Sequence, residues 1–338
     1  MFFGGQASSL LDELIQISKV VGEFVQHFAA DHLDGAGDFR DHCIYPLEDV
    51  GVRARPYLFA LGCQLGGRNP ADFIGVAGGL ELMQACTLVL DDIMDYSEIR
   101  NGRPAVYVKW GVSEAILVGD VLKSLGASAI IETLVGTERE CVVPALLALY
   151  ERTYRDACAG QHLDLSFEKQ DDITQAEYFE MIAGTTGRFV QSSLLTGAIV
   201  SGVDQATLDA LGSYGEFLGV AYQLRDDVID LIGDPELTGK PWAGDLKTKK
   251  KRLPLIRMLS TCSGKQRSEC ARIMAGTIDD AAAKRLQDLI TSTGSLDYCI
   301  QETQRLCDGA VAELVPLDNT PAKGRLLELA ELICAFET

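Results

Sequence analysis

Six aspartates form two clusters with the same spacing, DDIMD at residues 91–95 and DDVID at residues 226–230. Each cluster follows an apolar stretch, and residues four apart lie on one face of a helix. The first and last aspartates of a cluster should therefore point the same way, although like charges repel and apolar surroundings disfavour their burial. A bound cation would remove both penalties. Mg²⁺ prefers oxygen ligands and often bridges carboxylates to phosphates, so the clusters predict a site for magnesium and a diphosphate.

Basic residues follow both clusters, where a metal-bound diphosphate would need them. Arg100 lies five positions after Asp95, Lys240 follows the second cluster, and residues 247–252 (KTKKKR) form a dense basic run in an acidic chain. Metal ions and basic side chains stabilise the charge that develops on a departing diphosphate. An apolar helical interior would shelter the carbocation that remains. The sequence therefore predicts an enzyme that ionises an organic diphosphate.

The composition argues against several other classes of function. The chain has 338 residues and a net charge of −19, which disfavours a nucleic-acid partner. Its four histidines show no HExxH spacing, and its ten cysteines include no CxxC pair. Reduced, buried cysteines of a cytosolic protein are the expected state.

The sequence indicates a cytoplasmic protein without a transmembrane segment. Residues 1–13 lack the basic start and the cleavage pattern of a signal peptide. The longest apolar stretch, residues 73–90, contains Glu81 and Gln84 and runs into the first aspartate cluster. Such a stretch is typical of a buried helix and not of a membrane span.

The elements that must position the aspartates are predicted to be helices. No window alternates as a strand would, and no linker divides the chain, which predicts one all-α domain over residues 1–338. Residues 101–104, with Asn, Gly and Pro, should end the helix of the first cluster. The expected helices cover approximately residues 10–28, 53–65, 70–95, 115–134, 142–160, 175–200 and 205–230.

Local signals mark where several of these helices begin. Asn69 precedes a proline, Asp204 is a typical N-cap, and Thr320 precedes another proline. Thr174 is followed three positions later by a glutamate, the pattern of a capping box. A polar loop containing glycine is expected at residues 30–42.

Taken together, these motifs resemble those of the trans-isoprenyl diphosphate synthase family, the polyprenyl synthetases of the isoprenoid synthase superfamily. The similarity covers roughly residues 45–255. DDIMD and QLRDDVID match the two aspartate-rich motifs of the family, and the further motifs are matched by GQHLDL (160–165), YFEMI (178–182) and GKPWAGDLKTKKKRLP (239–254). The resemblance implies an all-α bundle with a central apolar cavity, an allylic isoprenoid diphosphate of C15–C20 or longer as substrate, Mg²⁺ with three ions expected, and a homodimer.

The resemblance also implies roles for individual residues. The aspartates implied as magnesium ligands are Asp91, Asp95 and Asp226, supported by Asp92, Asp227 and Asp230. The groups implied to hold the allylic diphosphate are Arg100, Lys240 and Lys250. Other implied substrate contacts are Arg53, Arg55, Gln161, Thr186 and Gln223, of which Gln161 and Gln223 would line the reacting centre.

The chain departs from the family where isopentenyl diphosphate, the prenyl acceptor, would bind. Val52 replaces the lysine of the usual GKxxR element, Gln84 replaces the histidine of ExxH, and Asn101 replaces the second arginine of RRG. A charged hydrogen bond to an anion contributes roughly 1.5–3 kcal/mol, so three losses would weaken acceptor binding strongly. Thr185 also replaces the lysine that usually precedes Thr186.

These departures leave three functions open. The first is ordinary prenyl transfer to isopentenyl diphosphate, held by Arg53, Arg55 or other basic groups. The second is a terpene synthase or cyclase, or transfer to a different acceptor such as an aromatic compound. The third is a regulatory subunit of a heteromeric synthase, which is disfavoured because both aspartate motifs are intact.

The residues before the first cluster bear on the length of the product. In the family, bulky aromatics at these positions stop chain growth early. Here the positions are Cys86 and Thr87, with Met83 one turn deeper. Small side chains would leave the pocket open, so a product of C20 or longer is expected.

Overall fold

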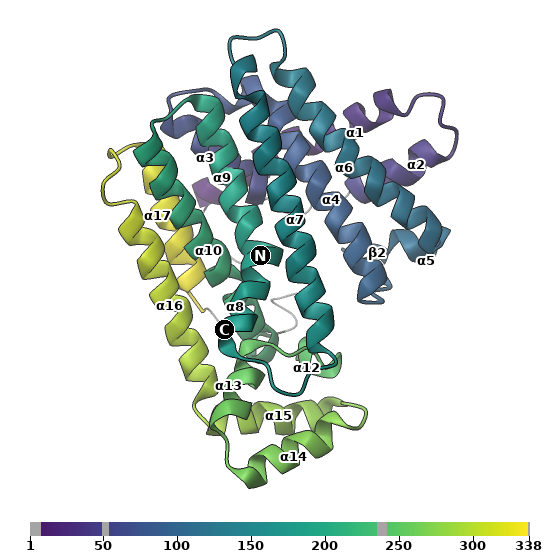
Figure 1. The fold of residues 1–338 in the computed structure, drawn as a ribbon, viewed down its shortest axis with the longest axis vertical. Coiled ribbons are helices and arrows are strands. Elements are labelled where there is room, and N and C mark those ends of the chain that lie inside the picture. The colour runs from purple at the N-terminus through teal and green to yellow at the C-terminus, as the bar shows by residue number, and fades with distance from the viewer. Residues whose placement is uncertain (1–7, 49–53, 235–241, 337–338) are drawn as a thin grey trace.

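The computed structural model describes residues 8–48, 54–234 and 242–336. Within these residues the chain is a bundle of helices with one short hairpin (Figure 1). The prediction of an all-α fold is confirmed. The first half contains α1 (Ser8–His32), α2 (Phe39–Ile44), η1 (Tyr45–Leu47), α3 (Ala54–Leu65), η2 (Pro70–Phe73), α4 (Ile74–Met94), β1 (Ile99–Arg100), β2 (Arg103–Pro104), α5 (Val106–Trp110), α6 (Val112–Leu134), η3 (Glu140–Val142) and α7 (Val143–Phe167). The second half contains α8 (Gln175–Ile182), the π-helical η4 (Ala183–Gly187), α9 (Arg188–Ser201), α10 (Gln205–Ile232), α12 (Gly244–Lys247), α13 (Leu253–Thr261), α14 (Gly264–Met274), α15 (Asp280–Ser292), α16 (Ser295–Glu313) and α17 (Pro321–Cys334).

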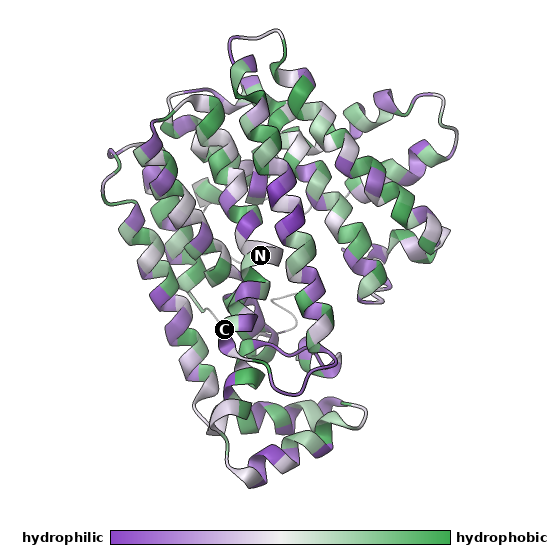
Figure 2. Ribbon diagram, in the orientation of Figure 1, coloured by the Kyte–Doolittle hydropathy of each residue, from purple (hydrophilic) through white to green (hydrophobic). Residues whose placement is uncertain are grey.

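Helix α4 carries the first aspartate cluster and lies in the core beside α6. Figure 2 shows mostly hydrophobic residues along both helices. The backbones meet closely, because a Cβ on Gly79 would lie 2.6 Å from the carbonyl oxygen of Gly126. Among the described residues, Pro70–Met94, which comprises η2 and α4, is the one helical segment long and apolar enough to cross a membrane. Within its most apolar window, 67% is buried inside the protein. It therefore serves as a core helix, as the sequence predicts.

The predicted helix starts are confirmed by side-chain caps. The Asn69 side chain accepts a hydrogen bond from the N–H of residue 71 at 3.2 Å, and Asp204 accepts one from residue 207 at 2.8 Å. Thr174 and Glu177 form a complete capping box, and Thr320 accepts from residue 323 at 3.2 Å. These caps fix where α8, α10 and α17 begin, and Asn69 caps η2, the 3-10 turn that leads directly into α4.

One expected loop has wrong bounds, and one expected helix has the expected ends but an irregular interior. The loop expected at residues 30–42 is shorter, because α1 continues to His32 and α2 begins at Phe39. The helix expected at residues 175–200 is interrupted by the π-helical turn η4. There α7 approaches so closely that a Cβ on Gly160 would lie 2.8 Å from the Thr185 nitrogen. Tertiary packing therefore reshapes this turn, which local sequence patterns do not reveal.

The segment that ends α4 folds back as a two-stranded antiparallel hairpin. Arg100 pairs with Arg103 across the strands, and Asn101 and Gly102 form the two-residue loop. Both loop residues have positive φ, 52° for Asn101 and 77° for Gly102. Asn-Gly is the preferred pair for a tight turn with two positive φ angles, so the residues expected only to break the helix also build this hairpin.

Candidate active site

The two aspartate clusters lie at the carboxyl ends of α4 and α10, as the spacing predicts. Asp91 and Asp92 belong to the last turn of α4, and the backbone N–H of Asp95 caps that turn by donating to the carbonyl of Asp91 at 2.8 Å. The carboxyl end of a helix carries partial negative charge and disfavours anionic side chains. Both helix ends therefore hold carboxylates in positions that a bound cation would stabilise.

Arg100 pairs with the most buried aspartate of the first cluster. Its Nε donates to Asp92 Oδ1 at 3.0 Å, and its guanidinium reaches to within 3.8 Å of Asp91. Asp92 is only 3% exposed. Burial raises the pKa of Asp92, and the hydrogen bond and charge of Arg100 act against that shift. The hairpin therefore brings a cation back onto the end of α4.

Burial and the charges of neighbouring aspartates disfavour the ionised carboxylates of Asp91 and Asp230. Burial, followed by the charge of Asp95, raises the pKa of Asp91 to about 6. Burial and the neighbouring charges of Asp245 and Asp226 raise the pKa of Asp230 to about 6. Among the described residues, no three carboxylate, histidine or cysteine side chains form a preassembled metal site. The donor set nevertheless fits Mg²⁺, because it consists of hard carboxylate oxygens that repel one another without a counter-charge.

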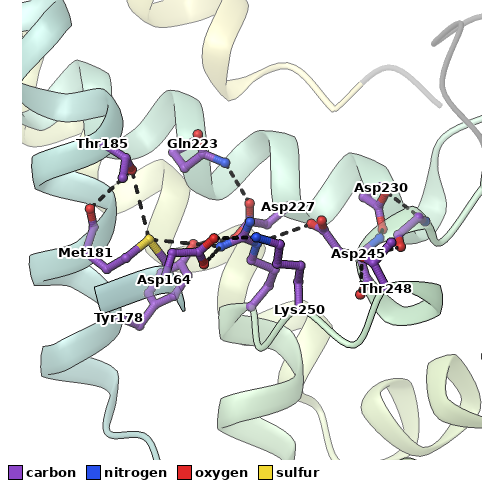
Figure 3. Close-up of polar contacts among 12 residues, drawn as sticks. Asp164, Tyr178, Met181, Thr185, Gln223, Asp227, Asp230, Asp245, Thr248 and Lys250 are labelled. Atoms are coloured by element: carbon purple, nitrogen blue, oxygen red, sulfur yellow. Dashed lines mark hydrogen bonds and ion pairs between the residues drawn. The ribbon is translucent and has the colours of Figure 1, made fainter. Parts of the chain in front are cut away.

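Lys250 joins the first cluster to α7. Its Nζ donates to Asp95 Oδ1 and to Asp164 Oδ2, both at 2.7 Å. Figure 3 shows Lys250 beside Asp164, and the side chains of these two residues are only 9% and 7% exposed. Arg252 donates to the other oxygen of Asp164 at 2.6 Å. Burial alone would raise the pKa of Asp164, but Arg252 and Lys250 together hold it below its ordinary value. One buried carboxylate thus holds two cations of the basic run in place.

The second cluster is built into a separate hydrogen-bond chain. Asp227 accepts from the Tyr178 hydroxyl at 2.6 Å and from the Gln223 amide at 2.9 Å (Figure 3). The Gln223 carbonyl oxygen in turn accepts from the Thr186 hydroxyl at 2.8 Å. Burial raises the pKa of Asp227 to about 7, although these hydrogen bonds and the charge of Arg252 favour its ionised form. These hydrogen bonds to Thr186 and Asp227 fix the orientation of the Gln223 amide.

Asp230 anchors the segment that carries the basic run. Its two carboxylate oxygens accept from the backbone N–H groups of Gly244 at 3.0 Å and Asp245 at 3.2 Å. These groups lie at the start of the short helix α12, whose last residue is Lys247. Asp230 therefore positions the loop from which Lys250 and Arg252 reach into the site.

A cavity of about 540 Å³ lies beside the first cluster, where positions implied for the acceptor meet one implied for the allylic diphosphate. Arg55, Gln84, Arg100 and Asn101 all line it. Arg55 lies over the ring of Phe189 with its guanidinium carbon 5.1 Å from the ring centroid, and burial lowers its pKa. The Arg55 Nε and the side-chain amide oxygen of Gln84 (Oε1) are buried without a hydrogen-bond partner. Buried polar atoms normally have a hydrogen-bond partner, and a ligand or water in the cavity would supply one here.

Other predicted residues are placed differently or fall outside the described part of the chain. Gln161 lies on α7, and its amide nitrogen is buried without a partner. The residues outside the described ranges are Val52, Arg53 and Lys240. A larger cavity of about 720 Å³, beside α7, η4 and α10, is lined by none of the predicted site residues, whereas Asp92, Arg100 and Arg55 line the smaller one.

Two of the three residues expected to line the product pocket are fully buried, and one of them contacts a tyrosine of α7. Met83 and Cys86 are fully buried, and the Cys86 sulfur lies 3.7 Å from the hydroxyl of Tyr154 on α7. The Thr87 hydroxyl donates to the backbone carbonyl of Gln84 at 2.8 Å. The small side chain of Cys86 therefore packs against Tyr154 of α7.

Sequence reasoning missed four residues that the structure places at these sites: Asp164, Tyr178, Arg252 and Tyr154. The first three lie within motifs that the sequence singles out, GQHLDL, YFEMI and the basic run. The available signal for Asp164 was its place in GQHLDL. Tyr154 lies in no motif, and its contact with Cys86 depends on how α4 and α7 are packed.

The sequence matches the polyprenyl synthetase family over residues 38–291. It is 33% identical over 332 residues to the short chain isoprenyl diphosphate synthase of Methanothermobacter thermautotrophicus, covering 98% of this chain and 96% of that protein. The fold is similar, with a TM-score of 0.90, to the geranylgeranyl pyrophosphate synthetase of Pyrococcus horikoshii Ot3, at 30% identity over 98% of this chain and 100% of that one. It is also similar to a polyprenyl synthase from Caulobacter crescentus CB15 complexed with calcium and isoprenyl diphosphate, with a TM-score of 0.83 and 26% identity over 96% and 97% of the two chains.

These similarities confirm the fold class and the family resemblance inferred from the aspartate motifs. They extend along nearly the whole chain and not only around the motifs. They favour prenyl transfer over cyclisation and over a regulatory role, because the named relatives are isoprenyl diphosphate synthases. The chain therefore belongs to the polyprenyl synthetase family, the trans-isoprenyl diphosphate synthases.

Proposed function

We propose that this enzyme ionises an allylic isoprenoid diphosphate of C15–C20 or longer and transfers the prenyl group to isopentenyl diphosphate, with Mg²⁺ as cofactor. The observation that carries the proposal is the position of Lys250 between Asp95 on α4 and Asp164 on α7. The Lys250 ammonium contacts Asp95 of the first cluster. Arg252, two residues later in the basic run, interacts electrostatically with Asp227 of the second cluster. A diphosphate between the clusters would meet both acidic groups for metal and basic groups for phosphate.

The aspartates would hold the metal in the proposed complex. Asp91, Asp95 and Asp226 supply the direct ligands, and the remaining three aspartates support them. Mg²⁺, with three ions expected, supplies neutralisation of the charge on the departing diphosphate when it is bound. The complex of the Caulobacter crescentus protein with calcium and isoprenyl diphosphate supports a divalent cation and a prenyl diphosphate in this fold.

The basic residues would hold the allylic diphosphate and stabilise its departure. Arg100 and Lys250 donate to carboxylates in the structure described here, and phosphate oxygens would replace part of those partners when the substrate binds. Lys240 is proposed as a third contact by the family resemblance alone. Preorganised donors aimed at a developing anion commonly contribute two to three powers of ten in rate.

The polar residues between the clusters would orient the reacting carbon. The Thr186 hydroxyl fixes the Gln223 amide, which faces Asp227. Gln161 carries an amide nitrogen without a partner on the facing helix α7. We place the allylic carbon between Gln161 and Gln223, with the acceptor approaching from the cavity lined by Arg55.

The contact between Cys86 and Tyr154 sets the proposed product length. The prenyl chain would extend along α4 from the aspartates toward Thr87, Cys86 and Met83. Cys86 alone would allow a product longer than C20, but the Tyr154 hydroxyl lies 3.7 Å from its sulfur. We therefore propose a product of C20, ending at this pair.

An exposed apolar face on α6 supports the proposed homodimer. Four apolar residues of α6 are partly exposed: Val112 at 48%, Ile116 at 44%, Leu117 at 52% and Ile131 at 37%. Clustered exposed apolar side chains mark protein interfaces. In sedimentation experiments, Leu117→Glu should yield monomers while Val315→Glu, on a residue that is 73% exposed after α16, should leave dimers. Monomeric wild-type protein would refute the assembly. Separately, we propose a cytoplasmic location.

The metal assignment is tested by conservative variants in both clusters. Asp91→Asn and Asp226→Asn should each abolish magnesium-dependent release of diphosphate from an allylic substrate. The control Asp288→Asn removes an exposed carboxylate that is 49% accessible and bridged to Lys284, and it should retain wild-type turnover. Retained turnover in either cluster variant would overturn the assignment.

A further inference from the structure

The hairpin after α4 places two arginines on one side of the chain. Arg100 and Arg103 are direct partners across the antiparallel strands. Directly opposed residues in such a pair project toward the same face. Both arginines accordingly line the cavity of about 540 Å³ that also contains Gln84. The hairpin thus offers the cavity a second guanidinium beyond the one that the family motif supplies.

Position 101, where the family usually carries an arginine, lies in the loop of the hairpin. Asn101 has a φ of 52°, in the left-handed region. Asparagine adopts that region several-fold more readily than most residues other than glycine. The Asn-Gly loop therefore suits the turn, and the next position that faces the cavity is Arg103.

The Arg103 side chain is held at the mouth of the cavity by two partners. Its guanidinium carbon lies 3.9 Å from the centroid of the Tyr45 ring, and its terminal nitrogen donates to Glu48 at 2.8 Å. Tyr45 is itself fixed, because its hydroxyl donates to the carbonyl of Pro104 at 2.8 Å. Tyr45 also lines the cavity. A planar guanidinium stacked on an aromatic ring is preorganised to bind phosphate through two parallel hydrogen bonds.

The pairing with Glu48 does not prevent such binding. The Arg103 and Glu48 side chains are 37% and 48% exposed, and an ion pair this exposed contributes little to stability. A diphosphate, with more charge than one carboxylate, would displace Glu48 readily. By contrast, Arg100 is already engaged with buried Asp92, on the side of the allylic diphosphate.

We propose that Arg103 binds the diphosphate of the prenyl acceptor and replaces, from a different position, a cation that the chain lacks at Asn101. The inference rests on the proposed function, since it takes isopentenyl diphosphate as the acceptor. It explains how the cavity can hold an anion although Gln84 and Asn101 are neutral. Arg55 lies deeper, against Phe189, and Arg103 serves the open end.

The test is the steady-state KM for isopentenyl diphosphate at saturating allylic substrate, with the dissociation constant measured by calorimetry. Arg103→Gln should raise both constants roughly 10- to 100-fold, the effect of losing a charged hydrogen bond, and leave the KM for the allylic substrate within twofold of wild type. Arg103→Lys should fall between. The control Arg68→Gln, which removes an exposed arginine bridged to Glu138 at 2.7 Å, should change neither constant.

Glu48→Gln separates binding from a structural role. It removes the same ion pair but frees the guanidinium, so the acceptor KM should stay equal or fall. An equal rise of the KM for isopentenyl diphosphate in Glu48→Gln and Arg103→Gln would overturn the proposal, because Arg103 would then act only by stabilising the hairpin. An unchanged KM in Arg103→Gln would overturn it while leaving prenyl transfer intact. A wild-type enzyme that does not consume isopentenyl diphosphate would overturn the proposed function as well.

Discussion

The Nζ of Lys250 lies 2.7 Å from the carboxylate of Asp95, a residue 155 positions earlier in the chain. The lysine comes from the loop after α12, and the aspartate caps α4. The contact joins the two halves of the sequence at the carboxylates proposed to bind metal. It also shows that a cation can approach the first cluster from the side of the second.

Lys250→Gln should lower kcat/KM for the allylic diphosphate by roughly 100-fold or more, because a charged donor to the departing diphosphate is lost. Lys249→Gln is the matched control: its side chain is exposed and precedes Lys250 in the same basic run. Initial rates of diphosphate release at several substrate concentrations check both variants. Equal rates for the two variants would show that Lys250 acts only as part of a diffuse basic surface.

Asp164→Asn should lower the free energy of unfolding by about 3 kcal/mol at neutral pH, since a buried ion-pair network then lacks its anion. Lys250 and Arg252 hold the pKa of Asp164 below its ordinary value despite burial. Its stabilising contribution is therefore present above the ordinary pKa and is lost as pH falls through the lowered value. Urea unfolding at several pH values measures this, and Asp288→Asn should change the stability by under about 0.5 kcal/mol. A pH-independent difference would argue against an ionised Asp164.

Asp91→Asn should act in the opposite direction and stabilise the metal-free protein above pH 6. Burial and Asp95 raise the pKa of Asp91 to about 6, so its ionised form is disfavoured in the folded state. Its favourable contribution is present below the ordinary pKa and is lost as pH rises through 6. Because this side chain is 32% exposed, a gain of roughly 1 kcal/mol is expected at pH 8. Thermal unfolding without metal should show the gain at pH 8 and none at pH 4, and a loss at pH 8 would contradict the assignment.

Tyr154→Ala should lengthen the product by at least one C5 unit, because it opens the space opposite Cys86. Chromatography of the dephosphorylated products measures chain length directly. Arg155→Ala, at the exposed neighbouring position of α7, should leave the product unchanged. A product of wild-type length from Tyr154→Ala would place the end of the pocket elsewhere.

Much of this fold could be predicted because its signals are local. Asn69, Thr174 and Asp204 cap helices in the structure as their sequence neighbours suggest. The spacing within DDIMD likewise placed Asp91 and Asp95 at the end of a helix. Caps and periodicity act over a few residues, so they survive in any tertiary context.

The rest depended on contacts between distant segments. Asp164 meets Lys250 and Arg252 from 86 and 88 positions away, and the Cys86–Tyr154 contact spans 68 positions. No local pattern encodes these distances. The hairpin is different, because its Asn-Gly pair is a local turn signal that predicts a tight turn as well as the end of α4.

Product analysis with each substrate omitted in turn tests the central claim most directly. An allylic diphosphate of C15, isopentenyl diphosphate and Mg²⁺ should together yield a longer diphosphate, and omission of any one should yield none. Hydrocarbon or alcohol formed without isopentenyl diphosphate would contradict prenyl elongation in favour of a cyclase or terpene synthase. The absence of any product until a second subunit is added would contradict it in favour of a regulatory role.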